Sequence, residues 1–177
     1  MKKILLTLSM TALLLFTAGC SCPFSDKTAD SKPQMNTAAA SAAEVAPDFS
    51  YKELGSGKTM RLSDLKGKPV FINFWATWCP PCVGELPHIE KKYAEYKDIM
   101  HFVILSVDDN EQEPARFIQS KGYTFPAAYG DHQALGRAYG IDAIPASYII
   151  SADGHIVARI VGSMNESSLD AFLQKAF

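Results

Sequence analysis

Two cysteines with the spacing of a redox pair, Cys79 and Cys82, lie in the sequence run NFWATWCPPC. A continuous apolar run over residues 70–76 enters this segment, and a pattern with helical spacing over residues 85–96 leaves it. The cysteines therefore stand where a buried strand turns into a helix, and the N–H groups and dipole of a helix N-terminus stabilise a reactive thiolate. A separation of three residues lets the second thiol reach the first, so a disulfide could open and close without moving the fold.

The two thiols have different expected roles. Cys79, at the N-cap and the more exposed of the two, is the predicted nucleophile, and Cys82, one turn inside the helix, is the predicted resolving thiol. Pro80 and Pro81 take the first two helical positions, where a missing N–H costs little. Because Pro81 has no N–H, the amide of Cys82 is the main donor left for the Cys79 sulfur. We therefore expect a moderately lowered pKa for the Cys79 thiol and a reducing rather than strongly oxidising couple.

The alternatives for this pair are a structural disulfide and half of a zinc site. The sequence has no second C-x-x-C and no Cys or His at ligand spacing after Cys82, which argues against zinc. Covalent haem attachment needs a His directly after the second cysteine, and Val83 stands there. We therefore expect no metal and no other cofactor. The histidines show no convergent spacing and are expected to be structural or solvated: His88, His101, His132 and His155.

The composition is that of one ordinary globular domain. The chain has 177 residues, of which 47% are apolar and 20% charged, with a formal net charge of −2. This is enough for a real core, and it is not basic enough to predict a nucleic-acid partner. The four cysteines form two close pairs rather than a dispersed disulfide framework.

The first 20 residues have the pattern of an export signal. Two lysines precede an apolar stretch, residues 4–16, that is too short to span a bilayer comfortably. Thr-Ala-Gly before Cys20 resembles the lipobox of bacterial lipoproteins, whose cysteine is acylated and becomes the new N-terminus, although Leu is usual where Thr17 stands. Cys22 fits the same pattern less well, and a plain secretory signal is the alternative. We expect residues 1–19 to be removed and an extracytoplasmic protein to be lipid-anchored to a bacterial membrane through Cys20.

Residues 20–45 are predicted to be a flexible linker between this anchor and a domain over residues 46–177. Small and polar residues dominate the linker, and few large apolar side chains could be buried there. A coil of this length has an r.m.s. span of roughly 25–30 Å. Cys22 lies in it as an idle thiol or a second acylation site. Loss of the two signal-segment lysines would change the net charge from −2 to −4, so the lipid rather than charge would hold the protein at the membrane.

The domain should alternate strands and helices and close with a hairpin. Continuous apolar runs at 70–76 and 102–107 are typical of strands buried on both faces, and Gly, Asn and Asp mark the turns and helix ends between them. This order predicts a three-layer α/β fold with a mixed sheet. The expected elements are strands 49–51 and 59–62, a turn or single helical turn 63–69, strand 70–76, a helix from 80, strand 102–107, a helix opened by Asp108, Asp109 and Glu111 and ending at 122, an extended piece 125–129, helix 131–140, strands 144–150 and 155–161, and a helix from 165.

The segment FWATWCPPC, followed much later by Ile144-Pro145, resembles thioredoxin-like proteins. In that fold a cis-proline faces the disulfide, and Pro145 matches it. Between Cys82 and Pro145 the chain is longer than a plain thioredoxin by one helix and one strand, roughly residues 110–130. This insertion after the second central strand, the N-terminal β-hairpin and the lipid tether resemble the TlpA/ResA-type extracytoplasmic thiol–disulfide oxidoreductases.

The resemblance also implies a proton carrier and a substrate contact. Thioredoxins have a buried carboxylate on the central strand, and Asn73 occupies the matching place here. TlpA/ResA-type proteins carry a Glu where Glu85 stands, which assigns it to proton transfer with Cys82, against the alternative of a solvated helix carboxylate. Trp75 is expected in the core. Trp78 is expected at the surface beside the nucleophile, where it would contact substrate together with Pro80 and Ile144.

The predicted function is reduction of disulfides in extracytoplasmic proteins by a membrane-tethered monomer. The resemblance implies protein disulfide and thiol substrates, electrons from a membrane thiol donor, and a place in cytochrome c maturation. Two alternatives are a peroxiredoxin, whose peroxidatic cysteine normally lacks a partner three residues on, and a copper-delivery protein, whose related motif is C-x-x-x-C. A third alternative, with the same thiol chemistry, is a reductant for methionine sulfoxide or peroxide enzymes.

Overall fold

The computed structural model describes residues 44–177. The predicted signal segment, the lipidated Cys20 and the linker up to residue 43 lie outside the described residues, and these assignments stay predictions. The described chain begins with Glu44 and Val45, which were predicted to end the linker but pair with residues 155–156 of the domain. Ile156 N donates to Glu44 O at 2.8 Å, and Ala46 N donates to Gly154 O at 2.9 Å.

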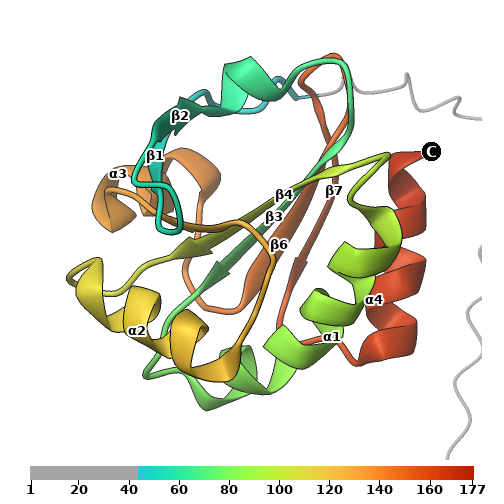
Figure 1. Ribbon diagram of the computed structural model, residues 1–177. Coiled ribbons are helices and arrows are strands. Elements are labelled where there is room, and N and C mark those ends of the chain that lie inside the picture. Colours follow the sequence, from blue (N-terminus) through green and yellow to red (C-terminus); the bar gives the residue numbers. More distant parts are fainter. Residues whose placement is uncertain (1–43) are drawn as a thin grey trace, which may run out of the picture. The chain divides into compact units, whose positions relative to one another are not determined.

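A seven-stranded sheet with the order β2-β1-β5-β4-β3-β6-β7 forms the middle of the domain (Figure 1). β3 pairs in parallel with β4, and β4 with β5, whereas the remaining neighbours are antiparallel. The predicted mixed α/β fold is therefore confirmed. The strands are β1 (Ser50–Glu53), β2 (Thr59–Arg61), β3 (Val70–Trp75), β4 (His101–Ser106), β5 (Ala127–Tyr129), β6 (Ala146–Ile150) and β7 (Ile156–Val161).

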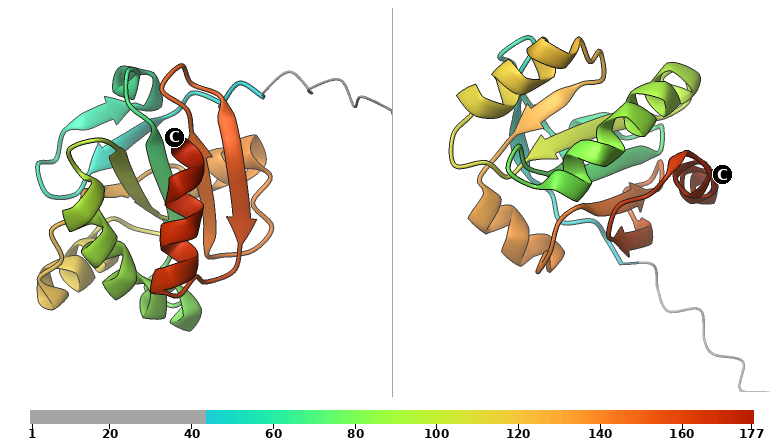
Figure 2. Two further views of the ribbon diagram at one scale, coloured as in Figure 1. Left: turned by 90° about the vertical axis from the view of Figure 1, so that its right-hand side faces the viewer. Right: turned by 90° about the horizontal axis from the view of Figure 1, so that it is seen from below.

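Helices cover both faces of the sheet (Figure 2). One face packs against α1, α2 and α4, and the other against α3 and the 3-10 turn η1. This gives the three predicted layers. The helices are α1 (Pro80–Tyr96), α2 (Gln112–Lys121), α3 (His132–Tyr139) and α4 (Glu166–Leu173), with the 3-10 turns η1 (Leu62–Leu65) and η2 (Gln174–Ala176).

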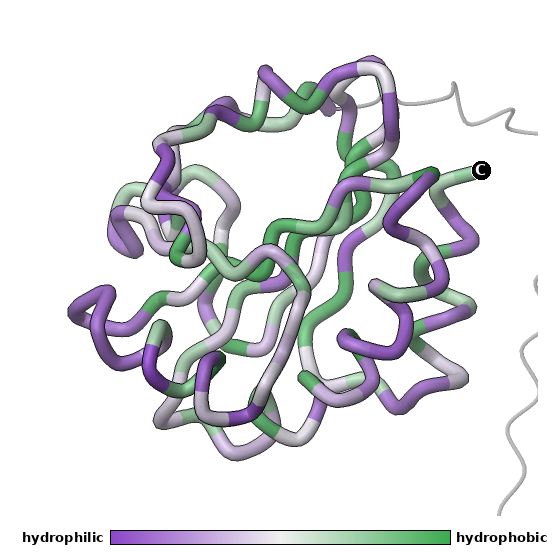
Figure 3. Tube along the Cα trace, viewed as in Figure 1, coloured by the Kyte–Doolittle hydropathy of each residue, from purple (hydrophilic) through white to green (hydrophobic). Residues whose placement is uncertain are grey.

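The central strand β3 explains why two helical layers are needed. All six of its residues are buried, and side chains alternate between the faces. Phe71 and Trp75 enter the core beneath α1, whereas Ile72 and Phe74 enter the core beneath α3. Figure 3 shows the resulting hydrophobic colour along the central strands. Asn73 is the polar member of this strand, and alternation places it on the face that α1 covers.

The predicted insertion consists of α2 and β5, and it joins the N-terminal hairpin to the central strands. β5 lies between β4 and β1 in the sheet. The prediction that Asp108 opens this helix is wrong. α2 begins at Gln112, and the Asn110 side chain caps it by accepting from the amides of Gln112 and Glu113 at 3.1 and 3.2 Å. Asp108 is instead fully buried, and its carboxylate accepts hydrogen bonds from the hydroxyls of Thr77 and Ser106.

α1 and α4, on the same face of the sheet, are joined by an ion pair and a hydrogen bond. Lys92 of α1 pairs with Asp170 of α4 at 2.8 Å, and the Tyr96 hydroxyl donates to Asp170 at 3.0 Å. The stem of Lys92 is buried while its ammonium is held by carboxylates, as is usual for long charged side chains. Within residues 44–177, no helix combines the length and the apolar composition that crossing a membrane requires.

Candidate active site

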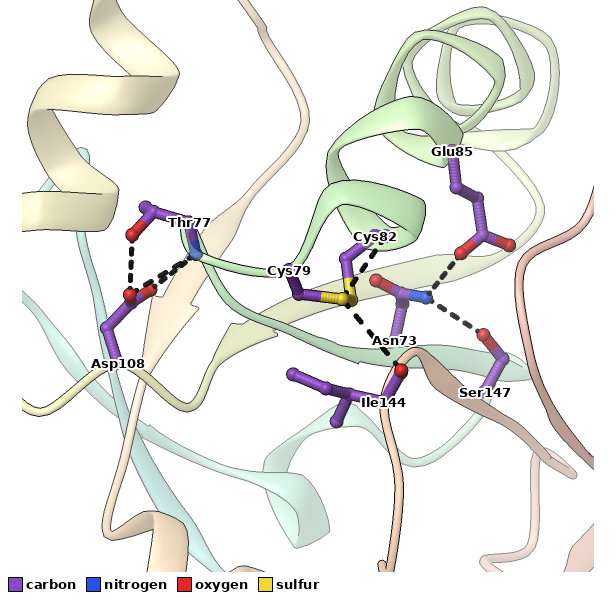
Figure 4. Close-up of a disulfide and its surroundings, with 8 residues drawn as sticks. All are labelled: Asn73, Thr77, Cys79, Cys82, Glu85, Asp108, Ile144 and Ser147. Carbon is purple, nitrogen blue, oxygen red and sulfur yellow. Dashed lines mark hydrogen bonds between the residues drawn. A yellow bond between two sulfur atoms is a disulfide. The ribbon is translucent and has the colours of Figure 1, made fainter.

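The two cysteines form a disulfide at the start of α1 (Figure 4). The S–S distance is 2.04 Å, and the Cα atoms are 5.3 Å apart. Cys79 is the N-cap, with extended backbone angles, and Cys82 is the third helical residue. Their exposed fractions are 5% and 1%. Cys79 is thus the more exposed residue of the pair, as predicted.

The helix N-terminus offers this sulfur a single close amide. Cys82 N donates to Cys79 Sγ at 3.3 Å, which is the contact predicted from the two prolines. Pro80 and Pro81 are exposed at the first two helical positions and have no N–H to offer. The first regular helical bond runs from Val83 N to Cys79 O at 3.0 Å.

The loop before β6 forms the wall opposite the disulfide. The Ile144–Pro145 peptide bond is cis, as the resemblance implied. The carbonyl oxygen of Ile144 lies 3.8 Å from Cys79 Sγ, so this oxygen could accept from the thiol once the disulfide is reduced. Gly162 N donates to Pro145 O at 2.8 Å and ties the end of β7 to the same loop.

An apolar hollow of about 320 Å³ opens beside the disulfide. Trp78, Val107, Ile141 and Ile144 contribute its apolar walls, while Asp109, Asp142 and His132 line it as polar groups. Trp78 is 64% exposed, and Trp75 is fully buried, as predicted for the two tryptophans. A larger cavity of about 690 Å³ lies by the β1–β2 turn and α2, away from the disulfide. Neither cysteine lines either hollow, but Trp78 and Ile144, which flank Cys79, line the smaller one. We therefore associate the smaller hollow with the disulfide chemistry.

Glu85 is buried one helical turn after Cys82, with only 1% of its surface exposed. Met164 N donates to Glu85 Oε1 at 3.0 Å, and Asn73 Nδ2 donates to Oε2 at 3.3 Å. Burial disfavours the charged carboxylate and raises the pKa of Glu85 to about 7, although both hydrogen bonds act in the opposite direction. The alternative of a solvated helix carboxylate is therefore wrong.

Asn73, expected only to replace the buried carboxylate of thioredoxins, is a functional candidate in the structure. Its amide nitrogen donates to Ser147 Oγ at 2.9 Å as well as to Glu85. Asn73 and Ser147 are register partners in the β3–β6 pair, and each is 1% exposed. A polar residue in the middle of each of two apolar strands was the available sequence signal.

Asp108 is a second residue whose place the sequence did not predict. It lies two residues after the end of β4 and accepts from Thr77 Oγ1 at 2.6 Å, from Ser106 Oγ at 2.7 Å and from Thr77 N at 3.1 Å. Thr77 lies two residues before the nucleophile. This buried carboxylate therefore fixes the loop that delivers Trp78 and Cys79 to the start of α1.

The arrangement suits transfer of electrons between two pairs of thiols. The outer sulfur of the disulfide can meet a partner sulfur, the inner one is shielded, and a carboxylate that titrates near neutral pH lies one turn away from Cys82. Exposed Trp78 and half-buried Ile144 provide apolar surface next to the reacting sulfur of Cys79.

Comparisons with known proteins agree with this chemistry. The family model Redoxin matches residues 40–173. The chain is 37% identical over 131 residues to the thiol-disulfide oxidoreductase ResA of Bacillus thuringiensis, covering 73% of this chain and 75% of that protein. The structure of StoA from Bacillus subtilis superposes with a TM-score of 0.63 at 28% identity, covering 73% and 98% of the two chains. The exposed lipoprotein thioredoxin Etrx1 of Streptococcus pneumoniae gives a TM-score of 0.59 at 31% identity, covering 73% and 99%.

Proposed function

Because this chain belongs to the Redoxin family and is a thiol–disulfide oxidoreductase, we propose that it works as a reductase of disulfides in proteins outside the cytoplasm. The observation that carries this proposal is the Cys79–Cys82 disulfide at the N-terminus of α1, with Ile144–Pro145 opposite it and Glu85 buried behind it. The proposed direction of electron transfer, from the protein to the substrate, rests on the start of α1. It offers the Cys79 sulfur one amide and so stabilises its thiolate only moderately.

The reaction consists of two sulfur exchanges. The thiolate of Cys79 attacks one sulfur of the substrate disulfide, and the other substrate sulfur leaves as a thiolate. Cys82 then loses its proton and attacks Cys79 Sγ, so the mixed disulfide breaks and the second substrate sulfur leaves. Two electrons have passed to the substrate, and the Cys79–Cys82 disulfide remains. A membrane thiol donor restores the dithiol by the same two steps in reverse.

Glu85 is proposed as the acceptor of the Cys82 proton. Its pKa of about 7 places it near the middle of its titration at neutral pH, which is the most effective range for a general base. Its position one turn from Cys82 and its burial keep the proton away from bulk water. In the reverse half-reaction the same carboxyl would return the proton to Cys82.

Substrate selection is proposed to use the apolar surface around the nucleophile. Trp78, Pro80 and Ile144 surround Cys79 with exposed or half-buried side chains. This surface fits an extended or unfolded segment that presents a disulfide together with apolar neighbours. Apocytochrome c before haem attachment is such a segment, and we propose it as a substrate on the strength of the TlpA/ResA-type resemblance.

The proposed location is the outer side of a bacterial membrane, with lipid on Cys20. The support comes from the lipobox-like sequence before Cys20 and from the similarity to a protein described as an exposed lipoprotein thioredoxin. A monomer tethered by a flexible linker could reach both a membrane donor and soluble substrates.

The deciding experiment is substrate trapping with Cys82→Ala in the full-length protein. Without the resolving thiol, the mixed disulfide on Cys79 should accumulate and its partner can be identified after reduction. Cys79→Ala, which keeps Cys82, is the matched control and should trap nothing. Capture of apocytochrome c by the first variant alone supports the proposal. Equal capture by both variants, or a trapped peroxide-dependent product in place of a protein disulfide, counts against it.

A further inference from the structure

The carbonyl oxygen of Asn73 is a buried acceptor with no hydrogen-bond donor among residues 44–177. The residue is 1% exposed, so water does not replace the missing donor easily. A buried polar atom without a partner costs free energy, and such atoms are rare in folded proteins. The other end of the same amide is fully used, because Nδ2 donates to both Glu85 and Ser147.

The orientation of this amide follows from its neighbours. If the amide were flipped, its carbonyl oxygen would face the carboxylate of Glu85, and two acceptors would oppose each other whenever Glu85 is ionised. The observed orientation instead gives Nδ2 two acceptors, Ser147 Oγ at 2.9 Å and Glu85 Oε2 at 3.3 Å. Figure 4 shows the carbonyl oxygen of Asn73 on the side of the two sulfurs, and the nitrogen on the side of Glu85 and Ser147.

In the oxidised enzyme neither sulfur of the pair can donate a hydrogen bond to this oxygen. A disulfide sulfur carries no proton, whereas reduction leaves a thiol on Cys82, and a thiol is a weak donor. We propose that the carbonyl oxygen of Asn73 accepts a hydrogen bond from the Cys82 thiol, and that this bond exists only in the reduced enzyme. The inference rests on Cys79 and Cys82 being the reacting pair.

This contact makes the amide a sensor of the redox state of the pair. Reduction by a dithiol donor adds two electrons and two protons to the disulfide while the donor becomes a disulfide, and one of the protons stays on Cys82 Sγ. That proton gives the Asn73 oxygen its missing donor, so the dithiol form is favoured relative to the disulfide. The same bond holds Cys82 as a thiol while Cys79 acts as the thiolate.

Infrared spectroscopy of the full-length protein tests the contact without a change at position 73. The S–H stretching band of Cys82 is identified in the reduced protein by its loss in Cys82→Ser. We expect this band at the position of a hydrogen-bonded thiol, and a band at the position of a free thiol overturns the inference. Failure of dithiols to produce any Cys82 band would overturn the redox pair itself, and the proposed function with it.

Variants then assign the acceptor. Asn73→Leu should move the Cys82 band to the free-thiol position, whereas Asn73→Asp, which keeps an acceptor oxygen, should not. Ser147→Ala is the matched control, because it removes a partner from the opposite end of the amide. Against glutathione, Asn73→Leu should shift the equilibrium up to about tenfold towards the disulfide, which equals about 30 mV for a two-electron couple. An unchanged band and an unchanged equilibrium in Asn73→Leu overturn the assignment.

Discussion

At the scale of single residues, Glu85 shows how burial sets a proton affinity. Its carboxylate has two donors, from Met164 N and Asn73 Nδ2, and these favour the ionised form. Burial nevertheless dominates and raises the pKa of Glu85 to about 7 from 4.5. In the folded protein the neutral acid therefore persists to a higher pH than in the unfolded chain, and folding stability must depend on pH through this residue.

We predict that the wild-type protein loses about 3 kcal/mol of unfolding free energy relative to Glu85→Gln as the pH rises from 4 to 8. The sign follows from the raised pKa: the stabilisation is fully present below pH 4.5, is lost between pH 4.5 and 7, where the folded state keeps a proton that the unfolded chain has released, and is gone above pH 7. Urea unfolding at several pH values measures it. Glu113→Gln, at an exposed carboxylate of α2, is the control and should give a nearly constant difference. A constant difference for Glu85→Gln as well would contradict the prediction.

The same residue should shape the kinetics. We predict that the rate of resolution of the mixed disulfide rises with an inflection near pH 7 in the wild type, because the ionised form of Glu85 takes the Cys82 proton. Glu85→Gln should lower this rate by roughly 10²-fold and remove that inflection. Stopped-flow measurement of the single resolution step separates it from attack by Cys79. An inflection that survives in Glu85→Gln would assign it to another group.

Asp108 offers a prediction about the loop before the nucleophile. Its carboxylate is fully buried and accepts from both the hydroxyl and the amide of Thr77. Asp108→Asn places an amide group among donors, so we expect a loss of about 2–3 kcal/mol of unfolding free energy and a slower reaction of Cys79. Asp109→Asn, at the exposed neighbouring carboxylate, should change stability by less than about 0.5 kcal/mol. Similar losses in the two variants would refute a specific role for Asp108.

At the scale of elements, the first turn of α1 sets the chemistry of the outer sulfur. An N-cap side chain normally accepts from the second or third helical amide. Here the second position is Pro81, and the sulfur has only Cys82 N at 3.3 Å. The number of amide donors at this one turn is therefore a direct control on the stability of the Cys79 thiolate.

We predict that Pro81→Ala makes the couple more oxidising by about 30 mV and lowers the pKa of the Cys79 thiol by about one unit. The restored amide would add a hydrogen bond to a charged sulfur, worth about 1.4 kcal/mol. Pro80→Ala is the matched control, because the first helical amide does not point at the N-cap side chain. Glutathione equilibration gives the potential and thiolate absorbance gives the pKa. Equal shifts in both variants, or a wild-type pKa below about 5, would refute the argument.

The elements themselves were largely predictable because their signals are local. The apolar runs of β3 and β4, the asparagine and aspartate caps of α4 and α3, and the glycine ends of α2 and α3 are all within reach of sequence periodicity and capping rules. The start of α2 was not predictable in this way, because Asp108 is a residue type that often opens a helix but does not do so here. Its actual partners, Thr77 and Ser106, depend on how β4 packs beside the redox loop.

In the site, too, the residues named by local motifs were predictable, whereas the contacts made by tertiary packing were not. Cys79, Cys82, Glu85 and Pro145 were predicted because a local motif, or a resemblance based on one, names them. The network around Glu85 was not predictable, because Ser147 and Met164 lie 74 and 79 residues along the chain from the groups they contact. Only the pairing of β3 with β6 and the path after β7 bring these groups beneath α1.

At the scale of the whole molecule, the domain carries the redox chemistry and the N-terminal segment is proposed to carry the location. The described domain, residues 44–177, contains the disulfide, the facing loop and the buried carboxylate. If a flexible linker separates them, as the sequence predicts, anchor and chemistry should be separable by mutation. The lipid would then act by concentrating the domain near a membrane donor rather than by changing the exchange reaction itself.

We predict that Cys20→Ser releases the protein from the membrane fraction and abolishes its labelling by radioactive fatty acid, while reduction of a soluble test disulfide stays within about twofold. The reason is that stable attachment needs several acyl chains, and the mildly acidic body does not replace them by charge. Cys22→Ser is the matched control two residues away and should leave both localisation and labelling unchanged. Release by Cys22→Ser instead would move the modification site to Cys22. Retention of the unlabelled Cys20→Ser protein in the membrane would mean that another contact anchors it, and electron supply from the membrane would then not depend on lipid at all.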